Sequence, residues 1–272
     1  MKASAFRKFW HYFKVFFVIK KLGFTGRASY RLNFLLLIFA VSFQMILSVI
    51  FVRTVFSFVK EIAGWSYFES LLVLASYMIV EGAVWMLFGQ MGAIKDLIRR
   101  GGLDSLLIKP VDAQLLVSAW RGDLEDVSRV FSGLAVLIYA ISNLNLPLEF
   151  ILFNSVFYFL FILNAVAIAY SFALFLQTMS FWLIKGHSLT MIQDSILSVS
   201  KFPTDIFFNK IVRFVFTFAV PIAFISTVPA KIFSEGFNFI FLLESFAVAG
   251  LFFWLSRKFW LFALRKYQSV GG

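Results

Sequence analysis

Long apolar stretches separated by short charged segments dominate this chain. A helix rises 1.5 Å per residue, so about 20 apolar residues are needed to cross roughly 30 Å of hydrocarbon. The stretches that meet or approach this length predict spans over residues 32–52, 67–93, 130–146, 150–184, 211–228 and 237–256. The pattern therefore predicts an all-α integral membrane protein whose six transmembrane helices form a single domain over residues 32–256.

Two of these stretches depart from a simple span. Residues 150–184 form an uncharged stretch. This stretch is too long for one straight crossing and too short for two, so one long, tilted or kinked helix is expected. The stretch 214–228 is short and contains Pro221. It reaches the required length from Ile211 if Arg213 extends its charge to the interface.

The charge distribution supports this topology and predicts an orientation. Lys and Arg outnumber Asp and Glu by 25 to 14, and 61% of the chain is apolar, so lipid is the expected solvent. By these spans, 22 of the 25 basic residues fall in the terminal segments and in the second and fourth connections. Because Lys and Arg concentrate on the cytoplasmic side, both termini are predicted there, and the net charge of +11 needs no nucleic-acid partner.

The N-terminal segment 1–31 is basic and aromatic. Trp10, Phe13 and Phe17 recur at helical spacing between Lys and Arg residues, which predicts a retained amphipathic helix lying along the inner leaflet. A disordered basic tail is the alternative. At the other end, residues 257–272 are expected to form a cytoplasmic tail.

The connection 95–129 is charged and balanced, which favours docking to a protein on the cytoplasmic side. Gly101 and Gly102 are expected to end one helix, and Asp104 is expected to cap a short turn. Asp112 is expected to cap a second short helix through Trp120. An ordinary ordered loop is the alternative reading.

Several polar side chains fall inside the predicted spans. Glu81 and Glu244 lie well within them, so each is a candidate for lining a pathway, for pairing with a basic residue, or for a packing role only. Asn164, Ser171 and Thr178 recur every seven residues on one helix face. That face favours interhelical hydrogen bonding over contact with a transported molecule.

Some chemistry is not indicated by these residues. The chain has no Cys, and His11 and His187 lack acidic or His neighbours at ligand spacing, so no metal site is predicted. No GxxxxGK[ST] phosphate loop is present, so ATP is not expected to bind here. Paired carboxylates or a Ser/Lys arrangement near a span are also missing, so a membrane enzyme is disfavoured.

Three segments carry a family resemblance. They are GWSYFESLL from Gly64, IRRGGLDSLLIKPV from Ile98, and KFPTDIFFNKIVRFVFTFAVPIAFISTVPAKIF from Lys201. Together they resemble the permeases of type-2 ATP-binding-cassette exporters, in the six-span branch with a Gly-x-Leu-Asp to Lys-Pro loop motif. The family's motifs are matched by Gly102, Leu103, Asp104, Lys109 and Pro110, and later by Pro203, Pro221 and Pro229.

The resemblance implies a non-catalytic permease of the bacterial plasma (inner) membrane. It implies a coupling helix in the loop between spans two and three, where Asp112 also lies, and short re-entrant helices before span six. It further implies two copies of a separate ATPase subunit that binds ATP and magnesium, and a second permease, either the same chain or a related one. No cofactor is expected in this chain.

Two other function classes compete with an exporter permease. One is a proton-coupled secondary carrier that uses Glu81 and Glu244 as proton sites. The other is a membrane-embedded enzyme or scaffold. The transported molecule is not indicated by the sequence.

Overall fold

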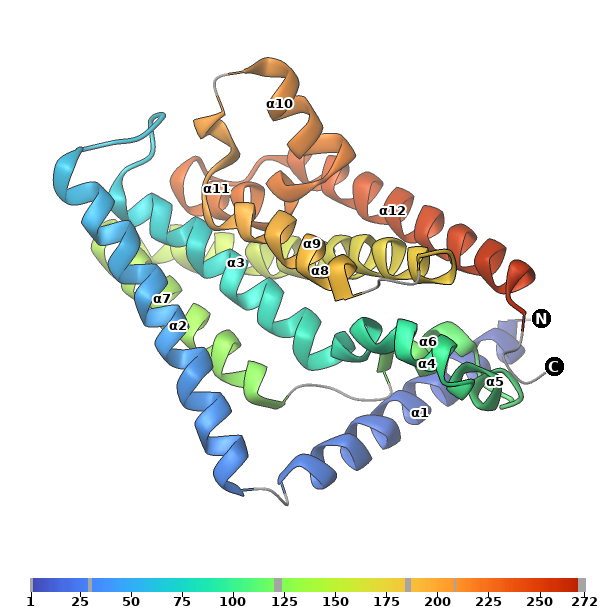
Figure 1. Cartoon of the computed structure of the whole chain (residues 1–272). Coiled ribbons are helices and arrows are strands. Elements are labelled where there is room, and N and C mark those ends of the chain that lie inside the picture. Colours follow the sequence, from blue (N-terminus) through green and yellow to red (C-terminus); the bar gives the residue numbers. More distant parts are fainter. Residues whose placement is uncertain (1, 29–30, 120–123, 184–186, 208, 269–272) are drawn as a thin grey trace.

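The structure, a computed structural model, describes residues 2–28, 31–119, 124–183, 187–207 and 209–268. These residues form helices and connecting turns without a strand (Figure 1). The α-helices are α1 (Lys2–Ala28), α2 (Arg31–Phe58), α3 (Tyr67–Phe88), α4 (Ile94–Arg99), α5 (Gly102–Leu107), α6 (Ala113–Ala119), α7 (Val127–Asn143), α8 (Leu148–Thr178), α9 (His187–Ser198), α10 (Lys210–Phe214), α11 (Val228–Ser234) and α12 (Phe239–Lys266). Parts of the predicted segments 1–31, 95–129 and 257–272 lie outside the described residues.

Four of the described helices are long and apolar enough to cross a membrane: α2, α3, α8 and α12. α7 is apolar but shorter, at 17 residues. This confirms the all-α membrane protein that the sequence predicts. The helix predicted to leave the membrane at Ser256 continues to Lys266, whereas the one predicted to reach Ala93 ends at Phe88.

α3 lies at the centre of the bundle. It begins at a capping box, in which Ser66 and Glu69 satisfy each other's backbone N–H groups. Every residue from Ser70 to Val80 is buried, against α7 on one side and α8 and α11 on the other. The start of α1 and the end of α12 lie near the short helices α4–α6, at the right of Figure 1. This end of the bundle is named the α4–α6 end, and the end farthest from it is named the opposite end.

Gly133 allows α3 and α7 to pack closely. A Cβ atom at this position would lie 2.8 Å from Ile79 Cγ1 and 3.0 Å from the Ile79 backbone nitrogen. Gly82 makes a similar approach from the α3 side, where a Cβ atom would lie 2.8 Å from Val130 Cγ2. Because backbone atoms cannot move away as a flexible side chain does, the two helices must separate to admit even a methyl group.

We expect Gly133→Ala to lower the free energy of unfolding by about 1–3 kcal/mol through this overpacking. Gly250→Ala on α12 is the matched control, because a Cβ atom there meets nothing within 4 Å. Ala favours a helix over Gly by about 1 kcal/mol, so the control should be neutral or stabilising. Thermal unfolding of the purified variants in detergent measures both, and equal behaviour of the two variants would contradict the close packing.

The span predicted over residues 211–228 is not a single helix. Lys210–Ala219 and Ala223–Ser234 are two helical segments bent by 72°. Val220 leaves the helical region at the break, with φ −125° and ψ 86°. Pro221 explains this, because proline disfavours a helical residue before it and supplies no N–H for the helix.

Both ends of this bent pair lie at the same end of the bundle. Arg213 and Lys231 come from its two segments, and both form ion pairs with Asp205. Lys231 Nζ also lies 3.0 Å from Glu235 Oε1. The pair therefore leaves and returns beside Asp205, while its middle residues are buried against α3 and α8.

Residues 187–206 run along the length of α3. α9 starts beside the C-terminal end of α8, where Gln177 donates to Gln193 Oε1 over 3.0 Å. At the far end of the segment, Trp65 donates its indole N–H to Asp205 over 3.1 Å, just before α3 begins. The segment thus extends from the α4–α6 end to the opposite end (Figure 1).

Candidate coupling region and membrane-depth cavities

The short helices α4, α5 and α6 form a packed layer under the long helices. Gly101, with φ +69°, turns the chain between α4 and α5 in a conformation that favours glycine. Leu103 and Leu106 of α5 are buried in a cluster that includes Leu174 of α8 and Trp260 of α12. The layer is therefore anchored to two membrane helices.

The outer side of α5 carries exposed apolar residues. Ile108, directly after the helix, is 85% exposed, and Leu107 is also exposed. Pro110 follows and is exposed as well. An isoleucine this exposed at the tip of an ordered turn is available for a protein partner.

Asp112 connects this layer to α12. Its carboxylate caps α6 by accepting from the Gln114 and Leu115 backbone N–H groups, which confirms the predicted cap. It also forms a two-pronged ion pair with Arg257, with N···O distances of 2.9 and 2.5 Å. Burial opposes its ionisation, but the hydrogen bonds and charge of Arg257 outweigh this effect and lower the pKa of Asp112 below its usual value.

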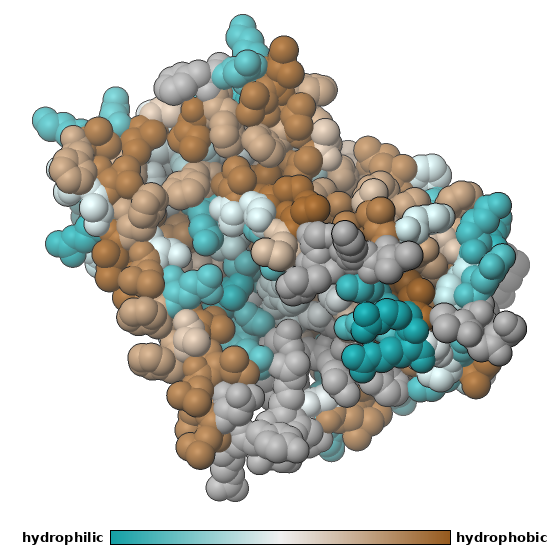
Figure 2. Space-filling view, in the orientation of Figure 1, coloured by the Kyte–Doolittle hydropathy of each residue, from teal (hydrophilic) through white to brown (hydrophobic). Residues whose placement is uncertain are grey.

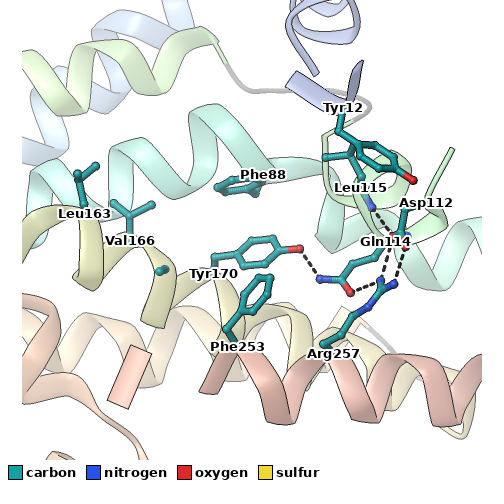
Figure 3. Close-up of a pocket in the computed structure, with 11 residues that line it drawn as sticks. Tyr12, Phe88, Asp112, Gln114, Leu115, Leu163, Val166, Tyr170, Phe253 and Arg257 are labelled. Atoms are coloured by element: carbon teal, nitrogen blue, oxygen red, sulfur yellow. Dashed lines mark hydrogen bonds and ion pairs between the residues drawn. The ribbon is translucent and has the colours of Figure 1, made fainter. Parts of the chain in front are cut away.

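Gln114 extends the connection to α8. Its side-chain oxygen accepts from Arg257 over 2.8 Å, and its amide donates to the Tyr170 hydroxyl over 2.9 Å. Ser118 shares a further hydrogen bond with that hydroxyl. One polar network thus joins α6, α8 and α12 (Figure 3).

A second polar site lies along α3 and contains an ion cluster. Arg129, near the start of α7, lies 2.7 Å from Glu81 Oε2 on α3 and 3.3 Å from Asp126 Oδ1. The side chains of Glu81 and Arg129 are only 12% and 11% exposed. Of the roles left open for Glu81, pairing with a basic residue is confirmed by this contact.

The ion cluster forms one wall of a cavity of about 300 Å³. The remaining lining residues come from α2, α3, α9 and the turn after it: Gln44, Tyr77, Trp85, Asp194, Ser198 and Lys201. Figure 2 shows hydrophilic side chains gathered in a hollow beside apolar α2. Asp194 is exposed and has no ion-pair partner within the described ranges.

The polar residues of α8 make contacts of different kinds. Asn164 donates to Ser245 of α12 over 2.9 Å, which is an interhelical hydrogen bond. Ser171 and Thr178 instead donate to carbonyl groups of their own helix, those of Ala167 and Leu174. Glu244 is partly buried on α12, and it does not line the charged cavity.

A larger, mostly apolar cavity of about 570 Å³ adjoins the network of Asp112 and Arg257 (Figure 3). α8 supplies Leu163, Val166, Ala167 and Tyr170, and α12 supplies Phe253 and Arg257. Tyr12 of α1 and Phe88 of α3 complete its walls with the start of α6. The cavity therefore lies between the long helices α8 and α12 and the start of the short helix α6.

A comparison with protein families decides the family. A family model described as "ABC-2 family transporter protein" matches residues 15–271. The chain belongs to the ABC-2 transporter family. A search of curated proteins and a search of solved structures each returned no match.

As an ABC-2 family member, the chain is a multi-pass membrane protein that takes part in transport. Membrane proteins of this family are typically non-catalytic and generally work with ATPase subunits. The charged cavity and the α4–α6 layer both carry chemistry beyond helix packing in the described part of the chain.

The loop residues singled out from the sequence have distinct surroundings in this ABC-2 protein. Leu103 is a buried anchor, and a Cβ atom on Gly102 would lie 3.2 Å from Leu97 Cδ2. The cap predicted for Asp104 is wrong, because α5 begins at Gly102 after the left-handed Gly101 and Asp104 lies within its first turn. Lys109 is partly buried and Pro110 is exposed.

Sequence reasoning missed Ile108, Gln114 and Arg257. Ile108 lies inside the motif GLDSLLIKP, but a six-residue helix is too short for periodicity to tell its buried face from its exposed face. Arg257 is 145 positions from its partner Asp112. The only signal for it was a charge placed directly after the last predicted span.

Proposed function

We propose that this chain is the membrane-spanning permease subunit of an ATP-driven exporter in the bacterial plasma membrane. It forms the translocation pathway and couples to two copies of a separate ATPase, which bind ATP and magnesium. The observation that carries the proposal is the family match over residues 15–271. The charged cavity at membrane depth and the exposed tip of α5 supply a pathway and a docking surface.

Six crossings follow if residues 187–206 form the fifth one. This segment runs beside α3 from one end of the bundle to the other, as its contacts at Gln193 and Asp205 indicate. The bent pair Lys210–Ala219 and Ala223–Ser234 is then a re-entrant hairpin on the outer side, before α12. α2, α3, α7, α8 and α12 are the other five crossings.

Lys and Arg remain concentrated at one end of the bundle when residues 187–206, and not 211–228, form the fifth crossing. With the fifth crossing moved, 19 of the 25 basic residues belong to the α4–α6 end, and five belong to the opposite end: Arg53, Lys60, Lys210, Arg213 and Lys231. Lys201 lies within the crossing. The excess still favours a cytoplasmic α4–α6 end with both termini inside.

The face formed by α2, α3 and α9 is proposed to line the pathway. Asp194 exposes a carboxylate on this face, and a carboxylate facing lipid at the centre of a helix costs about 2.5–3.5 kcal/mol. Gln44 of α2 is exposed there too. Water in the pathway and a second permease, identical or related, are proposed to supply hydrogen-bond partners to these two polar side chains.

A proton-coupled carrier is the alternative function. Of its two proposed proton sites, Glu81 lines the charged cavity and Glu244 does not. Glu81 is also occupied by its ion pair with Arg129. These contacts favour the ATP-driven exporter.

The test is affinity purification of the full-length chain from its native membrane, with identification of the proteins that accompany it. A stoichiometric ATPase with a phosphate loop is expected. Ile108→Asp should lower recovery of that ATPase at least about tenfold, since an apolar anchor residue contributes more than about 1.4 kcal/mol to an interface. The substitution should leave the fold intact because Ile108 is 85% exposed.

Ile108→Leu is the control, because it keeps an apolar side chain of equal size at the same exposed position. It should recover the ATPase as the wild type does. If the chain purifies alone and moves cargo in response to a pH gradient, the proton-coupled carrier replaces the exporter. Equal recovery with Ile108→Asp would remove the tip of α5 from the interface.

A further inference from the structure

The apolar cavity beside Arg257 changes character along its length. Leu163 of α8 and Phe253 of α12 line one half, and each is about half exposed. The other half is formed by Tyr12, Gln114 and Arg257. Its volume of about 570 Å³ falls within the range of about 300–1,000 Å³ that is usual for small-molecule sites.

The direction of this change matches that of a lipid in the leaflet next to the α4–α6 end. Along α8, Leu163 lies about 10 Å deeper in the bundle than Tyr170, at 1.5 Å per residue. On α12, Phe253 is likewise one turn deeper than Arg257. The apolar half therefore faces the middle of the membrane and the polar half faces its surface, as acyl chains and headgroups do (Figure 3).

The polar half also offers hydrogen-bond donors to an anion. The contacts of Arg257 with Asp112 and Gln114 use three of its five N–H donors among the described residues. Tyr12 adds a hydroxyl group at the rim.

We infer that this cavity binds a phospholipid of the adjacent leaflet. One acyl chain lies against Leu163, Val166 and Phe253, and the phosphate accepts hydrogen bonds from Arg257 and Tyr12. The bound lipid then fills the space between α8, α12 and the start of α6. The proposed function enters this inference at one point: the orientation given there makes the adjacent leaflet the cytoplasmic one.

Such a lipid stabilises the connection between α6 and the membrane helices. Its phosphate contacts the same guanidinium that holds Asp112, and its chain fills the gap between α8 and α12. A ligand that binds only the folded protein raises its stability in proportion to occupancy. The protein is therefore expected to retain a lipid during purification and to melt at a higher temperature with it.

The test uses the full-length chain in mild detergent, with and without added phosphatidylglycerol. Native mass spectrometry counts the retained lipids, and thermal unfolding reports the stabilisation. Ala167→Trp fills the cavity, so it is expected to lose one retained lipid and at least half of the lipid-induced rise in Tm. Ala135→Trp, at an exposed position of α7 outside the cavity, is the matched control and should behave as the wild type.

Phe253→Asn is the second variant, and it leaves the space open while making the wall polar. It should also lose the lipid, and it keeps the test valid if Ala167→Trp does not fold. Retention of the same lipid number by both cavity variants overturns the proposal, as does a detergent molecule or a transported compound in the cavity in place of the lipid. These readouts need no ATPase, so failure here is distinct from failure of the exporter function.

Discussion

Replacement of Arg129 by Met is expected to lower the free energy of unfolding by about 3–5 kcal/mol, because it leaves a buried charge without its partner. Glu81 and Asp126 would then face each other with no cation between them, and Glu81 is only 12% exposed. A loss of this size lowers Tm by roughly 2–4 °C for each kcal/mol in a chain of this length. Thermal unfolding of the purified protein in detergent measures the change.

Two further variants separate charge from shape in this experiment. The double variant Glu81→Gln with Arg129→Gln removes the Glu81–Arg129 charge pair but leaves the Asp126 carboxylate, so it should recover part of the lost stability. Asp194→Asn removes an exposed carboxylate of the same cavity that is repelled by Glu81, so it should leave the stability unchanged or raise it. An Arg129→Met variant as stable as the wild type would mean that water already solvates the ion cluster.

The large apolar helices could be predicted from sequence because hydropathy is a local property. α2, α3, α8 and α12 all follow from runs of apolar residues, with errors confined to their ends. The cap of α6 by Asp112 was also predictable, since a capping side chain bonds to backbone groups two and three residues away.

The path of residues 187–206 could not be predicted in this way. The segment contains Gln193, Asp194 and Lys201, so its hydropathy resembles that of a loop. Its polar groups are satisfied by residues distant in sequence, as when Gln193 accepts from Gln177. Polar residues can cross a membrane when neighbouring helices supply their partners, and the chain order does not reveal those neighbours.

The same limit applies to the candidate site. Sequence reasoning indicated that Glu81 needs a partner or water, but Arg129 lies 48 positions later, at the end of the predicted connection 95–129. The loop motif also mixed two kinds of residue, the buried Leu103 and the exposed Ile108. Family motifs mark a segment, whereas burial decides which of its residues anchor and which bind.

Replacement of Asp112 by Asn is expected to uncouple the α4–α6 layer from α12. Asn still caps α6, but it cannot form the two-pronged ion pair with Arg257. The loss of stability should be small, about 1 kcal/mol, because both side chains are about one-third exposed and solvent screens their attraction. In the proposed exporter, a coupling loss of about 1 kcal/mol corresponds to a fall of about fivefold in cargo moved per ATP hydrolysed.

Arg257→Lys is the matched comparison, because it keeps the charge but loses the planar fork that contacts both carboxylate oxygens, so an intermediate loss is expected. Transport and ATP hydrolysis measured together in proteoliposomes separate uncoupling from simple inactivation.

The pH dependence of coupling gives an independent check. Since the folded-state pKa of Asp112 is below its usual value of about 4, the contribution of the ion pair is fully present above that pH and is lost only as the pH falls through the lowered pKa. Loss of coupling between pH 8 and 5 in the wild type, or full coupling in Asp112→Asn, would show that this ion pair does not transmit the motion.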